Sequence, residues 1–503
     1  MAARQRTPAA ATDLGDGVAL TPARDAAARF VVRRSAAPRR GPARRAGRGT
    51  AAARPPALDG ALRATGARIV KTIEFSAWRR APVRRGATRR APAPVASVEV
   101  QTGPDEAAIV LREAPDGTVT WVYPEGPRAT RPRAPAAARA GRTWRFPIAP
   151  PPARSAPARA GRAPRRAAAP AMAAGFVIKV IVFKVVSWAA AELLEHLVRR
   201  HERRRMKEGL KAVGPAGFPA PGDAPLDALP DARNGRMLVF IHGTFSDSRG
   251  AFSDLDAATL TGLRARYPGG IYAFDHFSVS RSPLENAQAF YDRLLRVPGP
   301  YEVDLVCHSR GGLVARAIAE MNRQPSVAIR NVVLVGTPNA GTPLADPRRL
   351  EQCLELMTNL VGLMPRFAGL FAIEWILGAV QWVAAQGVGN LPGLVPQAPD
   401  SEFLRRLNDS ATSAPNARYA AITADYEPDT GLLAKLRDHG MDALMGAPND
   451  LVVPTASVLT VDPGADPPAL VATRIFKFSG ARVFHGNFFE QPETRDFLRA
   501  VLT

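Results

Sequence analysis

The sequence predicts an α/β protein, with a mostly parallel sheet flanked by helices, that follows a basic N-terminal region. From about residue 235, short runs rich in Val, Ile and Phe alternate with stretches of helical periodicity. The runs are continuously apolar, which is typical of strands buried on both faces. Strand–helix repetition of this kind favours a parallel sheet between layers of helices. The runs are RMLVFIHG, GIYAFDH, YEVDLVCHS, IRNVVLVGTP, RYAAITADY and TRIFKFSG.

The positive charge of the chain lies in its first third. Residues 1–175 carry 33 Lys and Arg against 11 Asp and Glu, which accounts for the whole formal net charge of +22. Residues 1–95 are also rich in Ala and Pro, and they cannot bury enough apolar surface to offset the entropy of ordering, so we expect a largely disordered basic arm. Its charge favours weak contact with nucleic acid or an anionic membrane, and the alternative is a solvated tail without a fixed partner. Neither an aromatic stacking platform nor a helix-turn-helix pattern is found, so we expect no sequence-specific nucleic-acid binding.

A small β-domain and a linker are expected after the arm. Short β-favouring runs, two of them joined by the turn sequence PDG at 115–117, predict a small β-meander at 96–126. A further run at 142–148 extends this domain to 96–148. Residues 149–175 are again rich in Pro, Ala and Arg and predict a linker.

Residues 176–234 form an expected helical connector. Its first part, 176–211, starts with an apolar run that contains Lys179 and Lys184 and ends in a basic stretch. The run is shorter than the about 20 residues that span a bilayer core. We therefore expect a helix that packs on the α/β domain. A helix in a membrane interface, held by its basic residues, and a spanning helix are the alternatives.

The cysteine content and the first residues bear on the compartment. The chain has two cysteines, Cys307 and Cys353, so a disulfide framework is not expected and reduced cytosolic thiols fit better. The first twenty residues contain no apolar core of a secretory signal. We expect a cytoplasmic protein, with peripheral contact at a membrane as the alternative.

Ser309 is the predicted nucleophile. The strand-like run VDLVC leads into HSRGG and then into a helical pattern, so Ser309 lies at a sharp strand-to-helix turn. Gly311 and Gly312 give this turn room. Cys307 stands where the usual G-x-S-x-G pattern has glycine, which makes the turn more crowded. The alternative is a loop serine that caps the helix.

His485 is the predicted general base. It follows the last predicted strand and precedes a final amphipathic helix, so a loop there can carry an imidazole over the edge of the sheet. His308 cannot act on its neighbour, because consecutive side chains at such a turn diverge and a base must come within about 2.6–3.2 Å. The other histidines considered are His196, His201, His276 and His439.

Asp450 is the predicted acid that orients the base. It lies in a polar turn before an apolar run, after one predicted strand and before His485. Asp425 and Asp442 are the rivals.

Two backbone N–H groups are predicted to bind the oxyanion. The Arg310 N–H lies at the positive end of the helix that follows Ser309. The loop after the first buried strand, His242-Gly243-Thr244-Phe245, supplies the other through the Thr244 N–H, with Phe245 as the alternative. We expect His242 to serve this loop as a hydrogen-bonding residue.

Residues from about 236 to 503 resemble the α/β-hydrolase superfamily, and within it the lipase, esterase and lecithin–sterol acyltransferase-like branch. The order Ser309, Asp450, His485 is that of the family. The resemblance implies an α/β-hydrolase fold and a serine hydrolase of carboxylic esters with lipid-like or apolar acyl groups, which needs no metal or cofactor. The alternatives are an acyltransferase with the same triad and a non-catalytic binding module. The resemblance is carried by FIHGT, CHSRGGLVAR, LVGTPNAGTPLA and NDLVVPTAS.

An apolar insertion at about 347–416 interrupts the α/β-hydrolase domain of 235–503. In lipase-like enzymes the corresponding insertion forms a cap that accepts acyl chains, so the resemblance implies a helical cap over the site. The alternative is a set of helices that only complete a core.

Overall fold

The computed structural model describes most of the α/β region and separate parts of the N-terminal region. The contacts of the chain divide it into two compact units. The N-terminal unit comprises Met1–Ala190, Leu354–Leu363 and Ile376–Gly387, and the C-terminal unit comprises Ala191–Cys353, Met364–Trp375 and Val388–Thr503. The described residues are 11–23, 26–34, 57–80, 96–125, 141–150, 175–185, 199, 202–346, 349–363, 373–386, 393–409, 417–427, 447–460 and 472–502.

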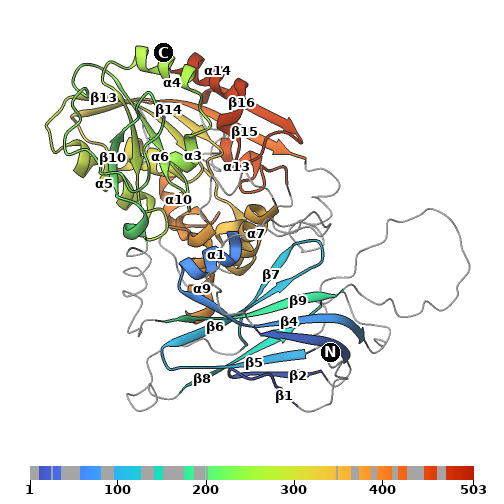
Figure 1. Ribbon diagram of the computed structural model, residues 1–503. Helices are drawn as coiled ribbons and strands as arrows, with labels where there is room; N and C mark the ends of the chain where they lie inside the picture. Colours follow the sequence, from blue (N-terminus) through green and yellow to red (C-terminus); the bar gives the residue numbers. More distant parts are fainter. Residues whose placement is uncertain are drawn as a thin grey trace, which may run out of the picture. The chain divides into compact units, whose positions relative to one another are not determined.

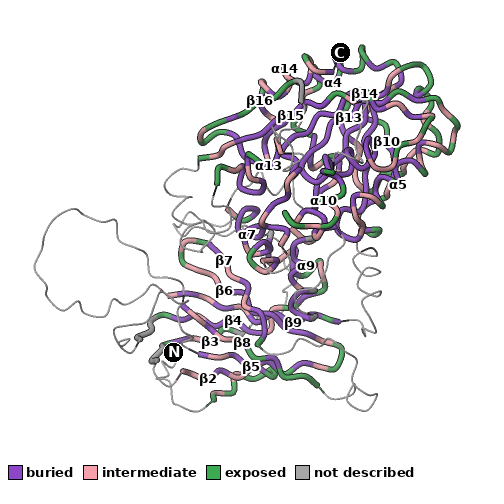
Figure 2. The backbone as a smooth tube through the Cα atoms, turned by 180° about the vertical axis from the view of Figure 1, so that it is seen from behind, coloured by how far each residue is buried: buried purple, intermediate pink, exposed green. Residues whose placement is uncertain are grey.

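A seven-stranded sheet forms the centre of the C-terminal unit. In spatial order its strands are β10 (Gly209–Ala212), β12 (Ile271–Asp275), β11 (Met237–Ile241), β13 (Tyr301–His308), β14 (Val327–Val335), β15 (Arg418–Tyr426) and β16 (Ala472–Gly480). β10 is antiparallel to β12, and every other neighbouring pair is parallel. The central strands are buried on both faces, as Figure 2 shows. The predicted α/β class is confirmed.

Helices cover this sheet in two groups. They are α3 (Ser248–Phe252), α4 (Ala257–Arg266), α5 (Pro283–Leu294), α6 (Gly311–Arg316), α10 (Glu402–Leu407), α13 (Thr455–Leu459) and α14 (Pro492–Val501). α5 and α6 pack together, with α6 on β13, whereas α4 and α14 pack together, with α14 on β14, and Figure 1 shows the two groups on either side of the sheet. α5 begins at a capping box of Ser282 and Glu285 with Pro283 as its first residue, which explains its sharp start.

The N-terminal unit contains two antiparallel sheets. One has the order β1 (Thr12–Asp13), β2 (Val18–Pro22), β5 (Ala96–Thr102), β8 (Arg142–Ile148). The other has the order β3 (Ala26–Arg34), β4 (Ala67–Arg80), β9 (Phe176–Lys184), β6 (Glu106–Glu113), β7 (Val119–Val122). A helix, α1 (Ala57–Ala64), packs on β4.

Two expectations for the first 150 residues are corrected by these strands. The described parts of the expected disordered arm, 1–95, contain β1 to β4 and α1, because alternating apolar side chains such as Ile73 and Phe75 are buried. The expected meander at 96–126 is divided, since β5 belongs to one sheet while β6 and β7 form a hairpin in the other. The expected linker lies outside the described residues from 151 to 174, and polyanion binding by the arm stays a prediction.

The expected helix at 176–211 begins as a strand. β9 lies between β4 and β6, and its β-branched and aromatic side chains fit a sheet interior. Lys179 is accommodated by ion pairs with Asp59 at 3.0 Å and Glu113 at 3.2 Å. The rest of the expected connector at 176–234 holds β10 and a helical turn at 202–205, among the residues described there.

The expected cap insertion contributes two helices to the N-terminal unit. These are α7 (Leu350–Leu363), from Leu354 onward, and α9 (Ile373–Gln386), from Ile376 onward. β7 is the last strand of its sheet, and the Asn359 side chain pairs with its outer edge. It accepts from the Val119 N–H and donates to the Val119 carbonyl, both at 2.8 Å. A cap over the site stays a prediction.

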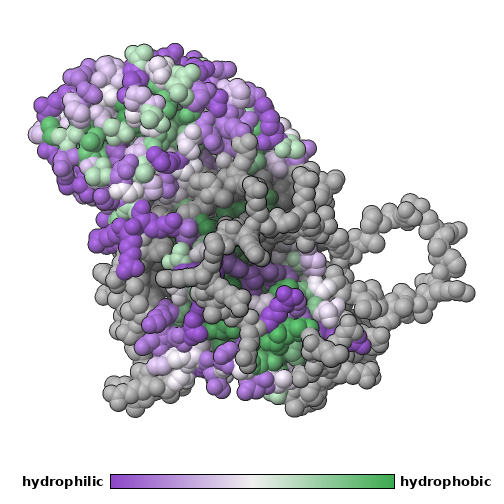
Figure 3. Space-filling view, viewed as in Figure 1, coloured by the Kyte–Doolittle hydropathy of each residue, from purple (hydrophilic) through white to green (hydrophobic). Residues whose placement is uncertain are grey.

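The described residues also show the character of the surface and the state of the two cysteines. On the face that Figure 3 shows, the described residues of the C-terminal unit are mainly hydrophilic, with hydrophobic ones scattered among them. Within the described ranges, no helix combines the length and the apolar character that crossing a membrane requires. Cys307 and Cys353 are free and buried.

Candidate active site

Ser309 lies at a strained turn between β13 and α6. Its φ of 55° is in the left-handed region, which is unfavourable for a residue with a Cβ. Its N–H donates to the Val335 carbonyl at 2.8 Å, so the turn is tied to the end of β14. A Cβ at Gly311 would overlap the Ile241 and His242 carbonyl oxygens. This is the geometry of a nucleophile elbow.

Asp450 and His485 form a buried pair. His485 Nδ1 lies 2.8 Å from Asp450 Oδ2, and the two side chains are 0% and 1% exposed. Asp450 Oδ1 accepts the N–H groups of Val452 at 3.0 Å and Val453 at 2.7 Å. The His485 N–H also donates to the Asp450 carbonyl at 2.9 Å. The turn at Asp450 and the loop at His485 are therefore held together by both backbone and side chain.

The second ring nitrogen of His485 is available. Asp450 Oδ2 can only accept, so the proton of the neutral ring lies on Nδ1 and Nε2 has a lone pair. His485 Nε2 is buried and has no hydrogen-bond partner in the described structure, Ser309 included. Leaving such an acceptor unsatisfied costs free energy, so His485 Nε2 is available to a proton donor that comes within reach.

His308 connects the turn at Ser309 to the loop that carries His485. Its Nε2–H donates to the His485 carbonyl at 3.0 Å, and the two ring centroids lie 4.7 Å apart. Burial lowers the pKa of His308 well below its ordinary value, so the ring is neutral. As predicted, His308 is no base for Ser309, but it brings the His485 loop against the elbow.

Gly336, the residue after β14, lies close to Asp450 and His485. Its φ of 57° favours glycine, and an added Cβ would lie 3.2 Å from both Asp450 Oδ2 and His485 Nδ1. Because the preceding residue, Val335, accepts from Ser309, one strand end touches all three predicted catalytic residues. The structure therefore brings together Ser309, Asp450 and His485; their catalytic roles stay predictions.

The loop after β11 lies against Ser309. An added Cβ at Gly243 would be 2.7 Å from Ser309 Cβ, so only glycine permits this approach. The Phe245 N–H donates to Ser278 Oγ at 3.1 Å and is not available to an oxyanion. The Thr244 and Arg310 N–H groups make no hydrogen bond in the described part of the chain. Thr244 is therefore favoured over Phe245 as the second donor.

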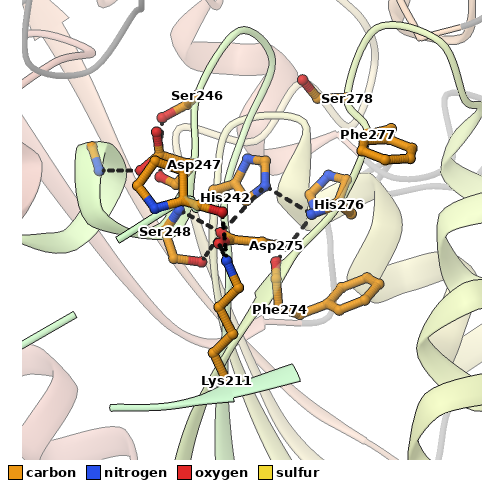
Figure 4. A network of polar contacts seen from close by, with 12 residues as sticks. Lys211, His242, Ser246, Asp247, Ser248, Phe274, Asp275, His276, Phe277 and Ser278 are labelled. Carbon is orange, nitrogen blue, oxygen red and sulfur yellow. Dashed lines mark hydrogen bonds and ion pairs between the residues drawn. The ribbon is translucent and has the colours of Figure 1, made fainter. Parts of the chain in front are cut away.

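A buried polar network supports this loop (Figure 4). Asp275 accepts from the Ser248 N–H at 2.8 Å and from Lys211 Nζ at 2.6 Å. The His276 N–H donates to His242 Nε2 at 3.1 Å, so His242 carries its proton on Nδ1 and donates to the Gly243 carbonyl at 2.9 Å. Burial lowers the pKa of both histidines, which keeps them neutral. His242 has the structural role that the sequence predicts.

The sequence predicts a role for the Arg310 backbone N–H but none for its side chain, which belongs to the polar network. Its guanidinium is fully buried, and burial lowers its pKa to about 9, which leaves it charged at neutral pH. It donates to the Gly393 carbonyl at 2.9 Å, to His276 Nε2 at 3.2 Å and to Asn286 Oδ1 at 2.9 Å. The only sequence signal is its position after Ser309.

The rivals of the predicted triad lie elsewhere or are not described. His276 belongs to the polar network, and Asp425 lies at the end of β15, 3.7 Å from Lys477. His196, His201, His439 and Asp442 lie outside the described residues. Within the described ranges, no group of three or more His, Cys, Asp or Glu could hold a metal ion.

The comparisons with known proteins identify the family. A family model described as a domain of unknown function, DUF7379, matches residues 207–503, which is more than half of the chain. The chain belongs to the DUF7379 family. The DUF7379 domain contains every residue of the candidate site. No curated protein matches the chain.

Several solved structures are similar to the chain at low identity. They include Bacillus licheniformis lipase BlEst2, with 16% identity, a TM-score of 0.35 and coverage of 56% of this chain and 96% of that one. Lipase 1 from Pelosinus fermentans has 13% identity, a TM-score of 0.37 and coverage of 53% and 97%. Carboxylesterase CesB from Bacillus subtilis has 12% identity, a TM-score of 0.29 and coverage of 62% and 97%. With TM-scores this low, the similarities do not bear on how the DUF7379 domain works.

Proposed function

We propose that the DUF7379 domain is a serine hydrolase of the α/β-hydrolase type that cleaves carboxylic esters. The observation that carries the proposal is the buried His485 ring, with Nδ1 on Asp450 and Nε2 without a partner, in contact with His308, which precedes Ser309 in a strained strand-to-helix turn. Hydrogen bonds between a nucleophile and its base are often formed only with substrate bound, so the missing bond to Ser309 is compatible with catalysis.

Each residue has a role in the proposed reaction. Ser309 Oγ forms a bond to the ester carbonyl carbon while its proton moves to His485 Nε2. The carbonyl electrons move onto oxygen, which the Thr244 and Arg310 N–H groups receive. The bond to the alcohol then breaks as His485 returns the proton to the alcohol oxygen. Water repeats these steps on the acyl-enzyme and releases the acid, while Asp450 stabilises the imidazolium throughout.

An apolar acyl or lipid-like group is the proposed substrate class. A hollow of about 500 Å³ lies beside the segment that carries Gln397, whose side chain contacts Thr244. Four of its eight lining residues are apolar and suit a hydrocarbon group; Asp346, Arg349, Asp400 and Ser401 line the rest, and Ser309 is not among the lining residues. The apolar lining residues are Pro343, Val395, Ala398 and Pro399.

Activity-based labelling tests the proposal. Wild-type protein should hydrolyse p-nitrophenyl butyrate and react with a fluorophosphonate, and Ser309→Ala should lose both. The matched control is Ser479→Ala, because Ser479 is exposed on β16 and should be dispensable. A wild type that neither turns over esters nor is labelled contradicts the proposal. Equal behaviour of the wild type and Ser309→Ala contradicts it as well.

A further inference from the structure

One short segment contacts both predicted oxyanion residues. We call residues 393–397 the return segment, because it follows α9 where the insertion rejoins the C-terminal unit. The Gly393 carbonyl accepts from Arg310 Nε at 2.9 Å. Gln397 Nε2 donates to Thr244 Oγ1 at 3.0 Å. Gln397 Nε2 also donates to the Gly393 carbonyl at 2.9 Å. The Gln397 side chain thus links Thr244 to the carbonyl that Arg310 contacts.

The orientation of the Gln397 amide is determined by its partners. The Gly393 carbonyl can only accept, so Nε2 and not Oε1 must face it. Thr244 Oγ1 therefore accepts a hydrogen bond from one N–H of Nε2, and the Gly393 carbonyl accepts one from the other. Gln397 is 5% exposed, so water does not compete for these bonds.

The return segment is itself fixed to the C-terminal unit. The Gly393 N–H donates to the Val279 carbonyl at 2.9 Å, and a Cβ at Gly393 would overlap the Ser278 carbonyl. The Thr342 N–H donates to the Gln397 carbonyl at 2.8 Å. Gln397 thus extends from a rigid backbone, which makes it suited to hold another loop in place.

Thr244 depends on such a support. Its N–H must point at the oxyanion, and this direction is set by the backbone of a loop that contains Gly243 and a residue, Phe245, with a φ of 55°. The loop is anchored on one side by the Phe245 N–H on Ser278. The Thr244 hydroxyl bond to Gln397 supplies the anchor at the donor residue itself.

We propose that Gln397 is a positioning residue that aligns the Thr244 N–H for the transition state. This inference rests on the proposed ester hydrolysis. Gln397 acts through Thr244 and does not touch the reacting atoms. A misplaced oxyanion donor stabilises the transition state less but leaves binding of the ester unchanged. The loss therefore appears in kcat.

Gln397→Met tests this role, because methionine has a similar length and makes neither hydrogen bond. We expect kcat for p-nitrophenyl butyrate to fall roughly 10–100-fold with KM within about twofold. Gln381→Met is the matched control, since Gln381 is a glutamine of α9 that donates to Thr65, and its kcat should stay at the wild-type value.

A double-mutant cycle with Thr244→Val separates positioning from a general structural role. If Gln397 acts through the Thr244 hydroxyl, the double variant should lose no more activity than Thr244→Val alone. Should Gln397→Met fail to fold, Gln397→Leu takes its place, because leucine can neither donate to nor accept from Thr244 and Gly393, and the same loss is expected.

The outcomes separate the two proposals. An active wild type with an unchanged kcat in Gln397→Met, or with additive losses in the cycle, overturns the positioning role alone. A wild type that is inactive and not labelled by a fluorophosphonate overturns the ester hydrolase, and the positioning role with it.

Discussion

Replacing Asp450 by asparagine tests the acid–base pair without changing its shape. Asp450 Oδ1 accepts two backbone N–H groups, from Val452 and Val453, whereas Oδ2 accepts one proton from His485. An asparagine carbonyl oxygen satisfies both backbone donors, but an NH₂ group there would satisfy neither. The asparagine should therefore keep its oxygen on the turn and direct its NH₂ group at His485 Nδ1.

This orientation reverses the tautomer of His485. Nδ1 must now accept, so the ring proton moves to Nε2, which can no longer take the proton of Ser309. We expect kcat to fall about 10⁴-fold, the scale of the same substitution in a serine protease triad. That ratio corresponds to about 5.4 kcal/mol of activation free energy. The fold should survive, because the two residues have nearly the same volume and both backbone bonds remain.

Ester hydrolysis and urea unfolding of Asp450→Asn would check this. The control is Asp425→Asn, which alters a carboxylate that is 25% exposed and 3.7 Å from Lys477, and should change kcat by less than about twofold. The argument is wrong if folded Asp450→Asn keeps wild-type activity. It is also wrong if Asp425→Asn loses as much, because Asp425 would then be the acid.

Two further predictions concern stability. Burial holds the pKa of His276 well below its ordinary 6.5. On acidification this histidine therefore binds a proton in the unfolded state but not in the folded state, and stability is lost as pH falls. Between pH 7.5 and 5.5 His276→Gln should lose roughly 1 kcal/mol less than wild type in urea unfolding; an equal loss contradicts the assignment. Asn359→Ala leaves the Val119 N–H and carbonyl without their partner and should cost about 2–3 kcal/mol, against under about 0.5 for exposed Asn234→Ala.

The parallel sheet could be predicted from the sequence because its signal is local. Each buried strand is a short apolar run, and polar or glycine residues follow its end, where the site forms. Ser309 stands directly after such a run, and His485 lies in the loop five residues beyond the last strand, so both lie at the same edge of the sheet. Arg310 and Gln397 gave no such signal, because their roles depend on which carbonyls and hydroxyls the folded loops bring near them.

The strands of the N-terminal unit could not be predicted as readily because their partners are distant. β4 pairs with β9 about one hundred residues later in the chain, across stretches rich in Pro and Arg. The composition of those stretches dominates any window that contains β3 or β4, which led to the expectation of disorder. In β9 the apolar run continues past Lys184, so its length favoured a helix over a strand.

The departure at Cys307 shows why the elbow pattern in a sequence is an incomplete guide. G-x-S-x-G requires small residues two positions either side of the serine, because the turn brings neighbouring segments very close. Here Cys307 is 0% exposed within β13, between Ile241 of β11 and Leu334 of β14. The space around Ser309 comes instead from Gly243, which approaches Ser309 Cβ from another segment. A glycine remote in sequence can thus supply the room that a pattern assigns to a near one.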